Sequence, residues 1–169
     1  MILKRTQNLI VGGALMGALF FFAGTVSGYD QHNTHPALTD EIVDLFNLNF
    51  VELKLSNEDK EWIVQGSVDE DTGVRPLNHF YDPVHNKGIA GGNSSKEWAV
   101  SPGEQRAWAE IDRPVIISQS MVEDTESPNG VFTWQRAIED YVVGNRKRAM
   151  LGIGHILHLL EDASVPDHT

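Results

Sequence analysis

The hydrophobic pattern is most regular near the end of the chain, where it predicts a long helical stretch from about Thr133 to Asp162 with an interruption at Gly144. From Arg146 to Asp162 the apolar side chains point in almost every direction around a helix axis. They are Met150, Leu151, Ile153, Ile156, Leu157, Leu159 and Leu160. A helix that is apolar nearly all round is surrounded by protein, so we expect this segment to lie at the centre of the fold.

Two shorter helices are predicted nearer the N-terminus. The first covers about Glu41 to Phe50, with Thr39 and Asp40 as its cap and with apolar residues on one face. The second covers about Asn57 to Gln65 and is opened by Ser56. A serine at this position accepts a hydrogen bond from a backbone N–H that has no partner within the helix.

A segment rich in turn-forming residues follows, from Gly66 to about Gly103. Loops of this length in compact domains are usually functional, and this one contains His79 and several acids, so we expect a functional loop. Beyond it, Ala107 to Ile111 predicts about one helical turn and Ser127 to Gly130 a tight turn. With helical patterns at both ends and no internal repeat, the predicted fold class is all-α with large loops.

The N-terminus has the pattern of an export signal. Lys4 and Arg5 precede an apolar run from Leu9 to Val26, and small residues follow it. We interpret residues 1–28 as a signal peptide and residues 29–169 as the mature domain, secreted or periplasmic. The alternative is an uncleaved membrane anchor, since the apolar run is near the length that spans a bilayer. The sequence has no cysteine, so no disulfide stabilises the exported domain and bound metal is expected to do so.

The charge of the chain limits its partners. The net charge is −11, and it is two charges more negative once Lys4 and Arg5 are removed with the signal peptide. A strongly acidic surface repels polyphosphate at long range, which argues against a non-catalytic nucleic-acid-binding module and predicts no stable nucleic-acid complex. Hydrolysis of a phosphodiester is not excluded, because bound divalent cations reverse the local field.

Candidate metal ligands gather at the end of the long helix. His158 and Asp162 are four residues apart, so their side chains lie on the same face. Pro166 ends the helix and allows the chain to return His168 toward that face. The alternative is a core helix in which His155 and His158 bond to backbone carbonyls. Three suitable ligands around one helix end favour a metal site.

Other histidines come from distant segments. His35 lies near the start of the mature chain and His79 lies in the predicted loop, shortly after the acidic run 69–71. Separate segments that supply imidazoles to one cleft are typical of a multinuclear site, whereas structural zinc sites usually use close-spaced pairs with Cys. The acidic run has a plain alternative as a solvated turn. Beside His79 we favour one acid as a ligand, and Asp71 over Asp69 or Glu70.

Four motifs together resemble one family. They are Thr34-His35-Pro36, Asn78-His79-Phe80-Tyr81-Asp82-Pro83, His158-Leu-Leu-Glu-Asp162 and Val165-Pro166-Asp167-His168. They resemble the bacterial zinc-dependent phospholipase C family, within the phospholipase C and P1 nuclease superfamily. The His-Phe-Tyr-Asp-Pro motif is more similar to the phospholipase branch. The likeness runs, with gaps, from about Thr34 to Thr169.

The resemblance implies an all-α domain that binds up to three zinc ions and hydrolyses a phosphodiester. It assigns one zinc to Asp71, His79, His158 and Asp162. A second zinc would share Asp162 and use His35, and the third would use His168. A carboxylate has two oxygens and can bridge two cations, which agrees with the place given to Asp162. Asp71 is also the candidate general base.

The chain departs from the family pattern at two points. Members typically begin with a Trp that binds zinc, and no Trp precedes Trp62 here. The family also supplies a further His and a Glu beyond the position of His168. We therefore expect a C-terminally truncated member, an incomplete third zinc site, and weak or absent activity.

The predicted function is zinc-dependent cleavage of a glycerophospholipid at a membrane surface, giving diacylglycerol and a phosphorylated headgroup. One alternative is a nuclease of the P1 type acting on single strands. A second, from a different class, is a secreted protein that zinc stabilises and that has no catalytic activity.

Overall fold

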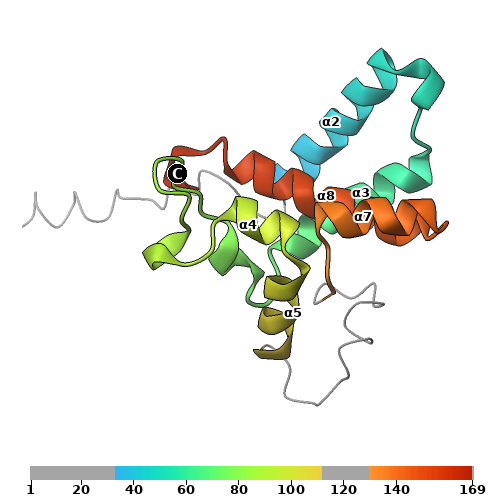
Figure 1. Ribbon diagram of the computed structural model, residues 1–169. Helices are drawn as coiled ribbons and strands as arrows, with labels where there is room; N and C mark the ends of the chain where they lie inside the picture. Colours follow the sequence, from blue (N-terminus) through green and yellow to red (C-terminus); the bar gives the residue numbers. More distant parts are fainter. Residues whose placement is uncertain (1–32, 112–129, 169) are drawn as a thin grey trace, which may run out of the picture. The chain divides into compact units, whose positions relative to one another are not determined.

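The computed structural model describes residues 33–111 and 130–168, and within these ranges the fold is all-α, as predicted (Figure 1). The predicted long stretch consists of two helices, α7 (Trp134–Val142) and α8 (Arg146–Asp162). Gly144 lies between them with a φ of 88°, a left-handed conformation that glycine adopts without a steric penalty. The interruption predicted at Gly144 is confirmed.

Helix α3 (Asn57–Glu70) begins where the sequence predicts and ends later. The Ser56 hydroxyl accepts a hydrogen bond from the backbone N–H of Asp59, and the Asp59 carboxylate accepts one from the backbone N–H of Ser56. This reciprocal pair satisfies two backbone donors at the helix start. The helix then continues through Gly66, so the prediction that a loop begins there was wrong.

Helix α2 (Thr34–Asn49) begins earlier than predicted. Thr39 lies inside the helix, fully buried, and its hydroxyl donates a hydrogen bond to Glu161 Oε1 at 2.9 Å. The predicted cap at Thr39 and Asp40 was therefore wrong. The hydroxyl bonds to a distant helix, a partner that the local sequence does not reveal.

The segment predicted as one long loop contains short helices. They are η2 (Arg75–Asn78), η3 (Ile89–Gly91), α4 (Ser95–Val100) and the start of α5 (Pro102–Ile111). Two more short helices lie outside this segment, η1 (Val51–Leu53) and η4 (Pro166–His168). In α5 the single turn predicted at Ala107 to Ile111 is part of a longer helix. The only pairing of extended backbone in the described ranges is an isolated bridge between Asp82 and Lys87.

Helix α8 is central, as its apolar pattern predicts. It packs mainly against α3 and α7, and also against α2 and α4 (Figure 1). A hydrophobic cluster of Val43, Ile63, Ala149 and Met150 joins α2, α3 and α8. The other end of α8 carries buried polar residues, which form the candidate site.

Helices α3 and α8 cross at two glycines. A Cβ atom added to Gly66 would lie 2.0 Å from the carbonyl oxygen of Leu151, and one added to Gly154 would lie 2.0 Å from that of Ile63. No side chain fits at these distances, so the glycines allow the two backbones to touch. This contact brings the C-terminal ends of both helices together.

Several sequence predictions lie outside the described residues. They include the signal peptide of residues 1–28 and the first part of the turn at 127–130. Among the helices that the structure describes, none has the length and apolar character needed to cross a membrane.

The glycine contact gives a stability prediction. Replacing Gly154 by Ala should lower the free energy of unfolding by about 2–3 kcal/mol or more, because the methyl group would meet backbone rather than a movable side chain. Gly103 in α5 is the matched control, since a Cβ there meets nothing within 4 Å; Gly103→Ala should change stability by less than about 1 kcal/mol. Equilibrium denaturation in urea measures both, and equal stabilities of the two variants would contradict the close crossing.

Candidate metal centre

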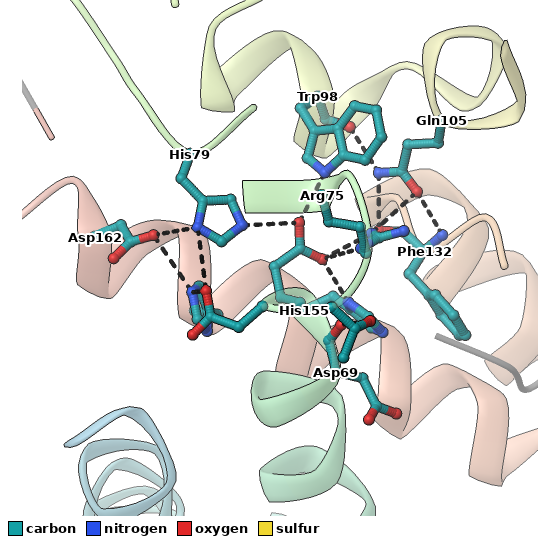
Figure 2. Close-up of polar contacts among 12 residues, drawn as sticks. Asp69, Arg75, His79, Trp98, Gln105, Phe132, His155 and Asp162 are labelled. Carbon is teal, nitrogen blue, oxygen red and sulfur yellow. Dashed lines mark hydrogen bonds and ion pairs between the residues drawn. The ribbon is translucent and has the colours of Figure 1, made fainter. Parts of the chain in front are cut away.

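The centre of the candidate site is the buried carboxylate of Asp162, the last residue of α8. Its Oδ1 atom lies 3.3 Å from Nε2 of His35 and 3.0 Å from Nδ1 of His168. Its Oδ2 atom lies 2.7 Å from Nδ1 of His79 (Figure 2). The same oxygen lies 3.3 Å from Nε2 of His158. Each oxygen of one carboxylate therefore faces its own pair of imidazoles.

Asp71 completes the side of the cluster that contains His79 and His158. Its Oδ1 atom lies 3.5 Å from Nε2 of His158 and 3.7 Å from Nδ1 of His79. Zinc–ligand bonds of about 2.0–2.2 Å in a tetrahedron place ligand atoms roughly 3.3–3.6 Å apart. The ligand atoms of His79, His158 and Asp162 all lie within 4.8 Å of one another, and so do those of His35, Asp71 and His158, so either group could hold a metal ion. The 2.7 Å between Nδ1 of His79 and Oδ2 of Asp162 is shorter than this tetrahedral spacing.

Five separate elements supply the ligands. His35 lies in the first turn of α2, and His168 lies in η4. Asp71 directly follows α3, and His79 directly follows η2. Helix α8 supplies His158 and Asp162. The backbone N–H of Tyr81 donates to the carbonyl of His168 at 2.8 Å, which ties the segment after His79 to the chain end. The ring of Phe80 meets the ring of His168 edge-on, at 5.1 Å between centroids.

Several polar atoms of the cluster are buried without a hydrogen-bond partner. His158 Nδ1 lies 2.7 Å from the carbonyl oxygen of Ser67, so Nδ1 carries the hydrogen and donates it. His158 Nε2, His168 Nδ1 and both oxygens of Asp162 are buried and make no hydrogen bond within the described residues, despite their close approach to one another. A lone pair of an imidazole repels a carboxylate oxygen that it faces, and either a proton on the ring or a metal ion between the two atoms removes that conflict. The donor set thus fits a metal ion.

A second carboxylate orients His35. Glu161 Oε2 lies 2.7 Å from Nδ1 of His35, and Glu161 Oε1 accepts the hydrogen bond from Thr39. When Nδ1 donates to Glu161, Nε2 is left to face Asp162. Imidazole ligands of metals are commonly held in this way by a carboxylate on the far ring nitrogen.

Neighbouring carboxylates change the proton affinity of these imidazoles. Burial alone would lower the pKa of His35, but Asp162 and Glu161 outweigh it and raise that pKa to about 9. Burial is likewise outweighed at His79, where Asp162 and Glu70 raise the pKa to about 9. Although burial favours a neutral acid, the imidazoles hold the pKa of Asp162 well below its usual value. In the metal-free chain, protons occupy the positions that a cation would take.

All six residues predicted as metal ligands lie in this cluster. They are His35, Asp71, His79, His158, Asp162 and His168. Of the acidic run, Asp71 faces the cluster, Asp69 accepts a hydrogen bond from Gln65 near the surface, and Glu70 points to a separate buried network. The geometry differs from the resemblance at one point: His35 and His168 approach the same oxygen of Asp162, whereas the resemblance assigned them to different zinc ions.

Sequence reasoning missed one supporting group, Glu161, whereas a bond from His158 to a backbone carbonyl, which is that of Ser67, is what the core-helix alternative expected. Glu161 directly precedes Asp162, but its partner His35 is more than a hundred residues away, so no local pattern indicates the contact. His155, which the core-helix alternative expected to bond to a backbone carbonyl, instead contacts Glu70 through Nδ1, and its ring stacks on Phe132. His85 is exposed and bonds to Asp82.

Comparisons with known proteins add no relative: no protein-family description, curated protein sequence or solved structure matches this chain. The resemblance to zinc-dependent phospholipases C stays a prediction that rests on the motifs alone.

The proton affinities predict how zinc binding depends on pH. Because the pKa values of His35 and His79 in the folded, metal-free chain are about 9, above their ordinary value, their protons stabilise that state below about pH 6.5 and this stabilisation is lost as the pH rises through 9. Zinc must displace these protons. Its apparent affinity should therefore rise between pH 7 and 9, by up to about tenfold per pH unit for each proton displaced.

Competition with a chelator at pH 7, 8 and 9, corrected for protonation of the chelator itself, measures this effect. Zinc affinity that is constant over this range would contradict ligation by these imidazoles.

Proposed function

We propose that this chain is a zinc-dependent phosphodiester hydrolase of the phospholipase C type, with the Asp162 cluster as its centre. The observation that carries the proposal is that the two oxygens of Asp162 each face a separate pair of imidazoles. A carboxylate in this setting is suited to bridge two cations. Paired divalent cations are a recurring arrangement in enzymes that displace a group at phosphorus.

The two sides of the carboxylate differ in ligand number. On the Oδ2 side, Asp71, His79, His158 and Asp162 would supply up to four ligands, the number that a tetrahedral zinc ion takes. On the Oδ1 side, His35, His168 and Asp162 supply three. Catalytic zinc sites usually have three protein ligands and one position for water or substrate, so the Oδ1 side is the candidate position for the substrate.

Asp71 is the candidate general base. Its side chain is 16% exposed, against 1% for Asp162, so it lies at the edge of the cluster. Within the described residues only Oδ1 approaches the histidines. Oδ2 is then available to accept a hydrogen bond from a water molecule and to take its proton.

The chemistry that zinc supplies when bound is Lewis acidity, which lowers the pKa of water to about 7 and neutralises charge on a phosphoryl group. The protein's part is to hold the ligands in fixed directions. Ser67 and Glu161 do this for His158 and His35 through the ring nitrogens that face away from Asp162.

An apolar groove on the neighbouring face of α8 favours a lipid substrate over a nucleotide. It has a volume of about 260 Å³ and is lined mostly by aliphatic side chains. It is lined by Tyr81, Ser95, Lys96, Ala99, Val100, Ile156, Leu159, Leu160 and Ala163. The link between the groove and the cluster is Tyr81, which lines the groove and whose backbone N–H donates to the carbonyl of His168. The predicted export segment, residues 1–28, would give such an enzyme access to external lipid.

Substitution of the two acids tests this function. With zinc present, we expect slow but measurable release of phosphocholine from phosphatidylcholine vesicles. Asp162→Asn and Asp71→Asn should each lower the rate by more than about 100-fold, beyond the 10–100-fold typical of residues that only support a ligand. Asp69→Asn is the matched control, because Asp69 belongs to the same acidic run but its carboxylate bonds to Gln65 rather than to the cluster, and it should leave the rate unchanged.

The other outcomes separate the alternatives. Release of nucleotides from single-stranded DNA, without release of phosphocholine, would replace the phospholipase by a nuclease. Zinc binding that raises stability, with no hydrolysis of either substrate, would identify a zinc-stabilised protein without catalysis.

A further inference from the structure

Glu70 is a completely buried carboxylate directly beside Asp71 in sequence, and it belongs to a different set of contacts. Its Oε2 atom accepts hydrogen bonds from Arg75 at 2.7 Å and contacts Nδ1 of His155. Its Oε1 atom accepts a hydrogen bond from the indole N–H of Trp98 at 2.8 Å. A buried carboxylate with a guanidinium partner and this many donors is well satisfied and held in one position.

The Glu70 network joins four elements. Arg75 is in η2, Trp98 is in α4, His155 is in α8, and Glu70 is the last residue of α3. The arginine guanidinium also lies 5.1 Å from the centre of the Trp98 ring. Figure 2 shows Arg75, Trp98 and His155 on the side of His79 that is opposite Asp162.

His79 is the link between this network and the candidate metal centre. Its Nδ1 atom faces Asp162 at 2.7 Å, and its Nε2 atom faces Oε1 of Glu70 at 3.6 Å. Nε2 is buried and makes no hydrogen bond within the described residues. The negative Glu70 oxygen is its closest charged neighbour among them.

We propose that Glu70 is a positioning residue, which keeps the ring hydrogen of His79 on Nε2 and so presents the Nδ1 lone pair to the metal. The inference rests on the proposed function for the metal centre and adds a residue that the motifs do not assign. A neutral imidazole that ligates through Nδ1 must carry its hydrogen on Nε2. A carboxylate opposite Nε2 stabilises that form and makes Nδ1 a stronger ligand.

The end of α3 explains how two consecutive acids have different tasks. Glu70 is the last helical residue and Asp71 is the cap that follows it, where the backbone leaves the helix. Asp71 therefore turns toward His79 and His158, while Glu70 turns toward Arg75, which follows it by one short turn. One helix end thus supplies a metal ligand and the group that orients another.

Glu70→Gln tests the inference in the full chain, with cobalt as a spectroscopic substitute for zinc. Gln keeps the size of the side chain and removes the negative charge, so affinity for zinc should fall about 10–100-fold and the visible absorption bands of bound cobalt should shift. Asp59→Asn is the matched control. Asp59 is also a buried carboxylate on α3, and Arg146 donates a bidentate pair of hydrogen bonds to it. It lies in the first turn of α3, whereas Glu70 lies in the last. That variant should lose stability and keep the zinc affinity and the cobalt spectrum.

The results distinguish this inference from the metal centre itself. If the unchanged chain binds neither zinc nor cobalt, the proposed function and the role of Glu70 both fail. If the unchanged chain binds metal and Glu70→Gln binds it equally well with the same spectrum, only the role of Glu70 fails. Nitrogen-15 NMR of the histidine rings in the zinc-loaded, unchanged chain gives an answer that does not depend on the variant folding. A hydrogen on Nε2 of His79 supports the inference, and one on Nδ1 overturns it.

Discussion

The structure depends on one buried anion, the carboxylate of Asp162, which lies among four imidazoles from separate parts of the chain. An ionised carboxylate without water is strongly unfavourable unless positive charge lies close to it. In the metal-free chain the positive charge comes from protonated histidines, as the raised pKa values of His35 and His79 indicate. Divalent cations would supply more charge in the same space, and they would accept the lone pairs that otherwise oppose each other. The same arrangement therefore explains both the stability of the cluster and its suitability for metal.

Side chains from distant segments reach Asp162 because the backbones of α3 and α8 are in contact. Gly66 and Gly154 allow backbone contact between the helices, and the residues that follow them reach one another. The carbonyl of Ser67, one position after Gly66, accepts the hydrogen bond from His158, one turn after Gly154. Asp71, which directly follows α3, lies beside the imidazole of His158 as well. The contact between the two helices thus holds the polar site in place, and a side chain at Gly66 or Gly154 would push the helices apart and displace the site.

The parts of this arrangement that sequence predicted are those with a local cause. The four-residue spacing of His158 and Asp162, the cap at Ser56 and the break at Gly144 all depend on neighbours in the chain, and all three appear in the structure. The ligand residues from distant segments were identified from residue type and from the resemblance.

What sequence could not predict depends on tertiary contacts. Thr39 reads as a helix cap by composition, but its hydroxyl bonds to Glu161 and α2 extends beyond it toward the N-terminus. Gly66 reads as a helix end, but the close helix crossing requires a glycine within α3.

The central claim is that Asp162 bridges two cations, and anomalous diffraction from zinc-loaded crystals tests it most directly. The account predicts two anomalous peaks, one near Oδ1 of Asp162 with His35 and His168, and one near Oδ2 with Asp71, His79 and His158. A single peak bound to only one side of the carboxylate, or zinc located elsewhere on the chain, would contradict it.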